Sequence, residues 1–208
     1  MKKNMRIIKK SITGVLFTFF AILALFTNQL KAEPGEFHFG IDGGLTYADM
    51  KAQETAQEIA NLSGSTVTYT YDEATWAGRL YGDYGIAENM DVELGWWITG
   101  SLDATYTISG ASATESYTMS AVDLSLKYDV DGSPFFVKGG IHRSTLEGAA
   151  TVTISGTEYN IADSITGTGW LLGGGIDMGD SRYGVTYIAN VGGNSDSSTA
   201  FGYYGFRF

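Results

Sequence analysis

Few residues of this chain have the chemistry of a catalytic centre or a metal site. The 208 residues include two histidines and no cysteine. The absence of cysteine excludes disulfides, thiolate metal sites and cysteine nucleophiles. His38 and His142 are far apart in the sequence, and neither belongs to a His-Glu-x-x-His motif. The sequence therefore predicts no metal site, and no cofactor is expected.

One fragment contains side chains that could act together in hydrolysis. His142-Arg143-Ser144, with Glu147 close behind, supplies the residue types of a base, a nucleophile and an orienting acid. A triad is defined by geometry, however, and a fragment of sequence does not provide it. Gly173-Gly174-Gly175 is not a phosphate-binding loop either, because it lies inside a strand pattern that no helix follows. We expect no catalytic residues and no enzymatic activity.

The first 32 residues have the pattern of a cleaved export signal. An apolar run over 15–26 precedes a small-residue cleavage site at Leu30-Lys31-Ala32. The run follows a basic segment that contains Lys2, Lys3, Arg6, Lys9 and Lys10. The alternative is a permanent membrane helix, but an apolar core of 12 residues is short for a bilayer.

Loss of this segment makes the protein strongly acidic. Six of the 13 basic residues and none of the 23 acidic residues lie in residues 1–32, so seven basic residues remain and the net charge becomes −16. Such a charge excludes nucleic acid as an expected partner.

The remainder, residues 33–208, alternates between apolar and polar positions. From Phe37 to Tyr47 the odd positions are mostly apolar or aromatic and the even positions small or polar, which is the period of a two-faced strand. Seven further segments repeat the pattern, at 75–84, 92–100, 122–128, 135–142, 170–177, 183–191 and 200–208. Eight strands are therefore predicted.

The links between these segments are alternately short and long. The short links are 86–90, 129–133 and 179–181, and the longer ones are 49–73, 103–117, 145–166 and 192–199. This alternation is typical of an all-β, eight-stranded antiparallel up-and-down transmembrane β-barrel. The alternative is a soluble barrel or sandwich. Charged residues lie on the face opposite most of the aromatic ones, and the aromatics cluster towards strand ends, which favours the membrane barrel.

The end of the chain carries a family resemblance. Tyr204, Phe206 and Phe208 occupy alternate positions up to the last residue. This looks like the signal that the barrel-assembly machinery recognises in outer-membrane proteins of Gram-negative bacteria. The mature chain resembles the OmpA-like eight-stranded outer-membrane barrels, including small OmpX-like and opacity-type surface proteins. The resemblance implies contact with outer-membrane lipid and lipopolysaccharide, and no periplasmic OmpA-type domain is expected after Phe208.

A second resemblance concerns the fragment at His142. His142-Arg143-Ser144 is similar to the His-x-Ser of lipid A deacylase barrels. The Asn-Ala-Gly that would follow is replaced by Thr145-Leu146-Glu147, and strand parity points His142 and Ser144 inward, away from a lipid substrate. A lipid A-modifying hydrolase is therefore the least supported alternative.

The inward positions predict a charge network inside the barrel. Eight strands leave room for little more than side chains, so the charges must pair. The predicted members are Asp42, Arg79, Asp83, Glu93, Asp123, Lys127, Lys138, Asp177 and Arg207. The expected pairs are Glu93–Lys127, Lys138–Asp177 and Asp42–Arg79. Such an interior is a structural plug, or alternatively a narrow gated channel in which the pairs exchange.

The long links predict structure outside the membrane. A short helix capped by Asp49 is expected to carry Ala52, Ala56, Ile59 and Ala60 and to end at Gly64. A bulge is expected near 72–74. Alternation continues towards tips at 109–112 and 155–157, which predicts protruding hairpins with exposed edges. These features favour a structural or adhesin-like role with an extracellular protein partner, and the alternative is a passive acidic coat.

Overall fold

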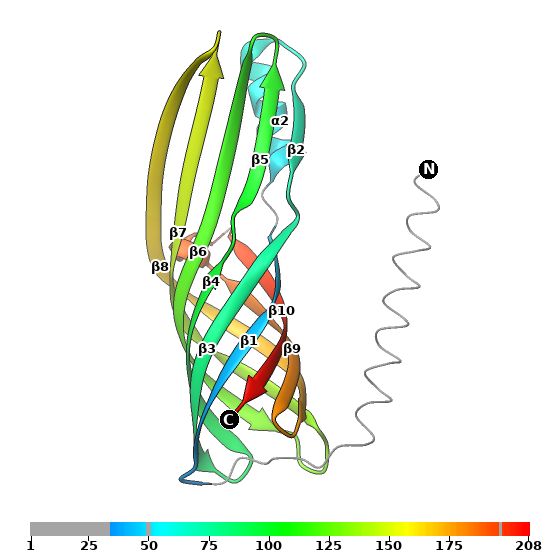
Figure 1. Ribbon diagram of the computed structural model, residues 1–208, viewed down its shortest axis with the longest axis vertical. Coiled ribbons are helices and arrows are strands. Elements are labelled where there is room, and N and C mark those ends of the chain that lie inside the picture. The colour runs from blue at the N-terminus through cyan, green and yellow to red at the C-terminus, as the bar shows by residue number, and fades with distance from the viewer. Residues whose placement is uncertain (1–33, 49–50, 196) are drawn as a thin grey trace, which may run out of the picture.

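The computed structural model of the protein describes residues 34–48, 51–195 and 197–208 (Figure 1). The predicted signal peptide lies outside the described residues. The bounds of the elements are β1 Phe37–Ala48, α2 Ala52–Ser63, β2 Thr68–Tyr71, β3 Ala74–Ala87, β4 Met90–Thr99, β5 Leu102–Ile108, β6 Ala111–Asp129, β7 Phe135–Ile154, β8 Thr157–Met178, β9 Ser181–Ala189, η1 Val191–Gly193 and β10 Ser198–Arg207. Among the described residues, no helix is long and apolar enough to cross a membrane.

Eight of the strands close into a barrel. β1 pairs with β3 on one side and β10 on the other, and the ring continues through β4, β6, β7, β8 and β9 with antiparallel pairing throughout. The turns β3–β4, β6–β7 and β8–β9 lie together at one end (Figure 1), where the sequence predicts short links. The predicted eight-stranded barrel is confirmed.

The outer surface of the ring is an apolar belt. Leu94, Leu124 and Leu172 keep 57%, 49% and 60% of their surface exposed. Exposed apolar surface around a whole barrel is stable against lipid and not against water. Exposed aromatic residues border the belt towards its two ends, Tyr47, Trp76, Trp96, Trp170 and Tyr187 on one side and Phe37, Tyr84, Tyr128, Phe135 and Tyr204 on the other.

The inner face is filled by charged and aromatic side chains together. An apolar cluster that includes Trp97 and Phe201 lies inside the barrel, and the two rings stack with centroids 6.5 Å apart. Inward glycines make room for the large groups. A Cβ on Gly95 would lie 2.3 Å from the guanidinium of Arg79, and one on Gly205 would lie 2.1 Å from the carboxylate of Asp42.

The Gly173-Gly174-Gly175 run is part of the barrel wall. It lies within β8, and a Cβ on Gly175 would lie 1.9 Å from the carbonyl oxygen of Tyr183 on β9. The run therefore lets two backbones pack closely, as its place in a strand pattern suggests.

Beyond one rim of the barrel the wall continues as an open sheet, which we call the projecting sheet. β6, β7 and β8 run past the end of β4, β5 pairs with the upper part of β6, and β2 pairs with β5 (Figure 1). The links expected at 103–117 and 145–166 are thus strands that end in tight turns at 109–110 and 155–156. β2 ends at Tyr71 and β3 begins at Ala74, so residues 72–73 separate the two strands in the region where the sequence predicts a bulge.

The helix expected in the first long link is present. α2 ends at Ser63, and its C-cap residue is the predicted Gly64, which has a left-handed φ of 64°. Lys51 is the N-cap residue, and the predicted cap Asp49 lies outside the described residues. Ala52 and Ala56 of the helix are buried against Ala104 and Tyr106 of β5. The helix therefore covers the inner face of the projecting sheet at its β2–β5 side.

Candidate functional site

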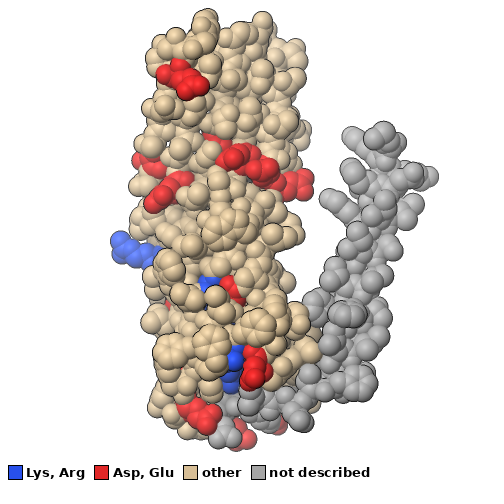
Figure 2. All heavy atoms as spheres, in the orientation of Figure 1, with Lys and Arg blue, Asp and Glu red and all other residues tan. Residues whose placement is uncertain are grey.

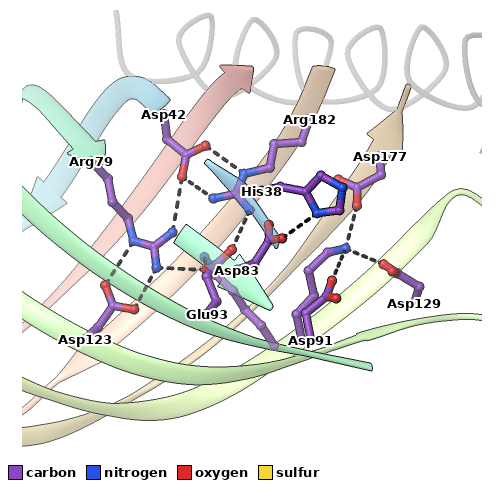
Figure 3. A network of polar contacts seen from close by, with 12 residues as sticks. His38, Asp42, Arg79, Asp83, Asp91, Glu93, Asp123, Asp129, Asp177 and Arg182 are labelled. Carbon is purple, nitrogen blue, oxygen red and sulfur yellow. Dashed lines mark hydrogen bonds and ion pairs between the residues drawn. The ribbon is translucent and has the colours of Figure 1, made fainter. Parts of the chain in front are cut away.

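One part of the charged interior is a group of ion pairs around two arginines, which we call the arginine cluster (Figure 3). Its members are Asp42, Arg79, Glu93, Asp123, Lys138 and Arg182, all buried. Arg79 donates two hydrogen bonds to Asp123, from Nε to Oδ2 at 2.9 Å and from Nη2 to Oδ1 at 2.7 Å. Arg182 donates from Nε and Nη2 to Asp42. Two-pronged pairing of this kind offsets the cost of removing charges from water.

Glu93 joins the two arginines. Its carboxylate accepts a hydrogen bond from Nη1 of Arg182 at 2.6 Å and lies 2.8 Å from Nη2 of Arg79. Nζ of Lys138 donates to the same carboxylate at 3.3 Å. The ring of Tyr81 lies 3.5 Å from the guanidinium carbon of Arg182. The arginine cluster thus links residues of six strands across the inside of the barrel.

A second group, the lysine cluster, consists of Lys127 and the carboxylates of Asp91, Asp129 and Asp177, which are labelled in Figure 3. Nζ of Lys127 lies 2.6 Å from Asp129, 2.7 Å from Asp177 and 3.5 Å from Asp91. One ammonium group is thus shared by three carboxylates.

The remaining predicted members, Asp83 and Arg207, are also buried on the inner face. Nδ1 of His38 lies 3.0 Å from Asp83. Arg207 has no ion pair within 4.0 Å among the described residues. The structure therefore places all nine predicted residues inside the barrel, and eight of them take part in these contacts.

Two of the three expected pairs are wrong. Asp42 does lie 3.4 Å from Arg79. Glu93 pairs with Lys138 instead of Lys127, and Asp177 pairs with Lys127 instead of Lys138. The register gives the reason. Lys127 is aligned with Asp91 on β4, whereas Glu93 is aligned with Ser125.

Sequence reasoning missed Asp91, Asp129 and Arg182. Each lies one residue beyond the end of a predicted strand, at 92, 128 or 183, and each has the inward parity of its strand. Extending the alternation by one residue would have found all three. No group of three or more His, Asp or Glu residues in the described part of the chain is arranged to hold a metal ion.

His142 and Ser144 make structural hydrogen bonds. Nε2 of His142 lies 2.8 Å from the carbonyl oxygen of Ala189. Oγ of Ser144 accepts a hydrogen bond from the backbone N–H of Gly192 at 2.9 Å. Both side chains point into the barrel, whereas Glu147 has the opposite parity on β7 and is exposed. The His142 contact thus links β7 to the end of β9, and the Ser144 hydrogen bond links β7 to η1.

The proposed assembly residues face outward. Tyr204, Phe206 and Phe208 are 38%, 47% and 75% exposed. The backbones of Phe208 and Phe39 exchange two hydrogen bonds, of 2.8 and 2.9 Å. The last residue thus helps to close the ring between the first and last strands.

The projecting sheet has one unpaired edge and one uncovered apolar face. On the side of β8 away from β7, the pairing with β9 ends at Trp170, so no described strand pairs with this edge over 157–168. Tyr159, Ile161 and Ile165 of β8 are 55%, 63% and 42% exposed, and they point to the same face that α2 covers on β5. The opposite face is mainly polar.

Acidic residues dominate the part of the protein beyond the rim. The described acidic residues there are Glu54, Glu58, Asp72, Glu73, Asp103, Glu115, Glu147, Glu158 and Asp163, against Lys51 and Arg143 as basic residues. Figure 2 shows acidic side chains over the projecting sheet and a belt that is mostly uncharged. The surface beyond the rim therefore carries a net negative charge.

Known proteins resemble the chain in structure. The attachment invasion locus protein Ail of Yersinia pestis has 12% identity and a TM-score of 0.54, with 85% of this chain and all of Ail covered. The chain has the fold of the small outer-membrane barrels. Neisserial surface protein A (TM-score 0.41, 16% identity, 84% and 98% covered) and OprG of Pseudomonas aeruginosa (0.44, 14%, 85% and 98%) are more distant in shape. No protein-family model and no curated protein sequence matches the chain.

Proposed function

We propose that the chain is an outer-membrane protein of a Gram-negative bacterium whose projecting sheet binds a protein outside the cell. The observation that carries the proposal is the sheet itself, which stands beyond the apolar belt and whose outer β8 edge pairs with no described strand over 157–168. Unpaired N–H and C=O groups on a sheet edge form a template to which a partner can add a strand. The role is one of binding, with no catalytic step.

The orientation follows from the two ends of the barrel. In outer-membrane barrels short turns face the periplasm and long connections face outward. The projecting sheet lies at the long end. The predicted export signal and the outward Tyr204, Phe206 and Phe208 support delivery to the assembly machinery, and the belt would contact outer-membrane lipid and lipopolysaccharide. Ail is named for attachment, and its shared fold supports a similar role here.

The uncovered face favours binding over a passive coat. A coat needs only polar residues in contact with water, whereas Tyr159 and Ile161 leave more than half of their surface exposed. Neighbouring apolar side chains that remain exposed outside the membrane mark an interaction surface.

Trimming one hairpin tests the proposal. Gly148 and Asp163 are cross-strand partners, so removing 149–162 and joining them through a two-residue turn shortens the sheet without changing the barrel ring. Bacteria that express the trimmed protein should lose adhesion to host cells and to surfaces coated with extracellular-matrix proteins. Thr151→Ser with Thr153→Ser is the full-length control. Adhesion that survives the trimming would remove the basis of the proposal.

A narrow channel is the second candidate, and one observation favours it. The described interior contains seven buried carboxylates, at Asp42, Asp83, Asp91, Glu93, Asp123, Asp129 and Asp177, against five buried Lys and Arg side chains, at Arg79, Lys127, Lys138, Arg182 and Arg207. This excess of negative charge would favour cations if a path opened. The shared ion pairs and the stacked Trp97 and Phe201 fill the interior, which supports a plug more strongly.

A further inference from the structure

The inner face of the projecting sheet is apolar along its whole width but covered over only one half. On β5, Ala104 and Tyr106 are buried under Ala52 and Ala56 of α2. On β8, Tyr159 and Ile161 have no such cover among the described residues. The β5 half of this face is therefore covered by α2, and the β8 half is exposed in the described structure.

A hollow of about 260 Å³ lies in the open half. The register places Tyr117 of β6, Gly148 of β7 and Asp163 of β8 in one row. Since Gly148 has no side chain, the ring of Tyr117 leans over it, and a Cβ there would lie 3.1 Å from that ring. The volume is below the roughly 300–1,000 Å³ of sites that enclose a whole small molecule. The hollow therefore suits a single long side chain.

The lining of the hollow combines apolar and acidic side chains. Leu146, Ile161 and Ile165 supply apolar surface, and Glu115 and Asp163 supply carboxylates on two different strands. Tyr117 donates a hydrogen bond from its hydroxyl to Glu115 at 3.4 Å. Burial raises the pKa of Tyr117, and the charge of Glu115 adds to the effect, so the hydroxyl stays a neutral donor.

This combination matches the side chain of lysine or arginine. Both have an apolar stem that packs on hydrophobic surface and a cationic head that seeks carboxylates. An aromatic ring beside the cation adds a cation–π contact. The excess of acidic residues around the projecting sheet selects the same sign of charge in a partner.

A strand that pairs with the free edge of β8 would place such a side chain in the hollow. A strand added to this edge would direct alternate side chains over the inner face, and the residue opposite Asp163 would bring its Cβ to within about 5 Å. A second copy of this chain is a poor occupant, because pairing two β8 edges would bring together acidic segments that contain Glu158 and Asp163.

We propose that the extracellular partner adds an extended segment to β8 and places a lysine or arginine of that segment in the hollow between Glu115 and Asp163. This inference rests on the proposed function, which requires only that the projecting sheet binds a protein. Apolar residues two positions before and after the cation would cover Ile161 and Ile165.

Binding of defined peptides tests the inference. The probe is a fluorescent peptide of alternating threonine and valine with one central lysine, and its partner probe has norleucine in place of the lysine. Fluorescence anisotropy with the full chain refolded in detergent micelles should show the lysine peptide binding about tenfold more tightly, the size expected for one charge-assisted contact.

Substitutions on the two faces of the sheet complete the test. Glu115→Gln with Asp163→Asn should remove the preference for lysine and leave binding of the norleucine peptide unchanged. Glu147→Gln with Glu158→Gln removes two charges from the opposite face and should change neither affinity more than about twofold, since screened surface charges contribute little.

Three outcomes would overturn the inference: equal affinity for the two peptides, equal losses from the two double substitutions, or concentration-dependent dimerisation without peptide binding. Loss of adhesion on trimming 149–162, together with any of these, would leave the proposed function standing without the cation site. Unchanged adhesion would overturn the proposed function itself.

Discussion

At the scale of single residues, the two faces of each strand are in opposite solvents. Leu124 points into lipid at 49% exposure, and its neighbour Ser125 is 2% exposed inside the barrel. A charge placed on Leu124 therefore meets hydrocarbon, whereas a charge placed at an inward position meets other ions and meets them in a crowded space. For a charge introduced at adjacent positions, the free-energy cost is therefore loss of hydration at the outward position and crowding and unpaired charge at the inward one.

The outward position gives the first prediction. Leu124→Arg should lower the free energy of unfolding by about 2–4 kcal/mol, since arginine near the membrane centre loses its hydration. Urea unfolding in lipid vesicles measures the change. Ser116→Arg, on the same face of β6 but beyond the belt, is the control and should change the value by less than about 0.5 kcal/mol. Equal effects from the two substitutions would mean that the belt is assigned to the wrong part of β6.

The arginine cluster gives the second prediction. Arg182→Met should destabilise the barrel by about 3–5 kcal/mol, because Asp42 and Glu93 lose a buried partner. Adding Asp42→Asn should recover part of that loss, since it removes a carboxylate left without its main partner. The same unfolding measurement on both single variants and the double variant gives the coupling energy. Strictly additive losses would argue that Arg182 and Asp42 do not depend on each other.

At the scale of elements, the sequence predicts more about strands than about their partners. Alternation around Phe37 and Leu124 is enough to assign faces, and the Asp- and Gly-rich links are enough to place the turns. The ends of strands are harder to predict, because a polar residue such as Arg182 or Asp91 is equally compatible with a turn and with an inward position in a strand. The ion pairs depend on register and tilt, which alternation within one strand does not contain, and so Lys127 and Lys138 exchange their expected partners.

The helix outside the barrel gives the third prediction. Ala56 is 5% exposed against β5, and Gln57 beside it is exposed. Ala56→Glu should detach α2 from the sheet and speed proteolytic cleavage within 51–66, while the urea midpoint of the barrel stays the same. Gln57→Glu introduces the same charge on the solvent side, and cleavage should remain at the wild-type rate. A fall in the barrel midpoint with Ala56→Glu would show that the helix and the ring unfold together.

At the scale of the whole molecule, the barrel serves as a rigid support for the sheet. Its interior is filled by ion pairs and by the stacked rings of Trp97 and Phe201. These contacts connect strands across the inside of the barrel and stabilise the wall. Strand parity predicts a filled interior made of polar and charged side chains, whereas the structure also contains an apolar cluster there. The aromatic part was missed because Trp97, Phe136 and Phe201 share parity with charged residues of the same strands.

Conductance gives the fourth prediction. Purified protein in planar bilayers should show no reproducible current steps, because eight strands enclose little more than their own side chains. Trp97→Ala with Phe201→Ala empties part of the interior and provides a comparison in which a leak can be detected. Regular steps from the wild-type protein would favour the channel and would count against the plug.

The open edge of β8 also determines how far the protein can reach. From Trp170, the last residue of β8 that pairs with β9, to Thr157 at the turn, β8 extends through 13 residue steps. At about 3.3 Å per residue this segment extends roughly 40 Å. The lipid headgroup layer is only about 5–8 Å deep on each side of the bilayer. A segment bound near the tip would therefore lie clear of the membrane, and the length of the β7–β8 pair would set the distance between the membrane and the proposed partner.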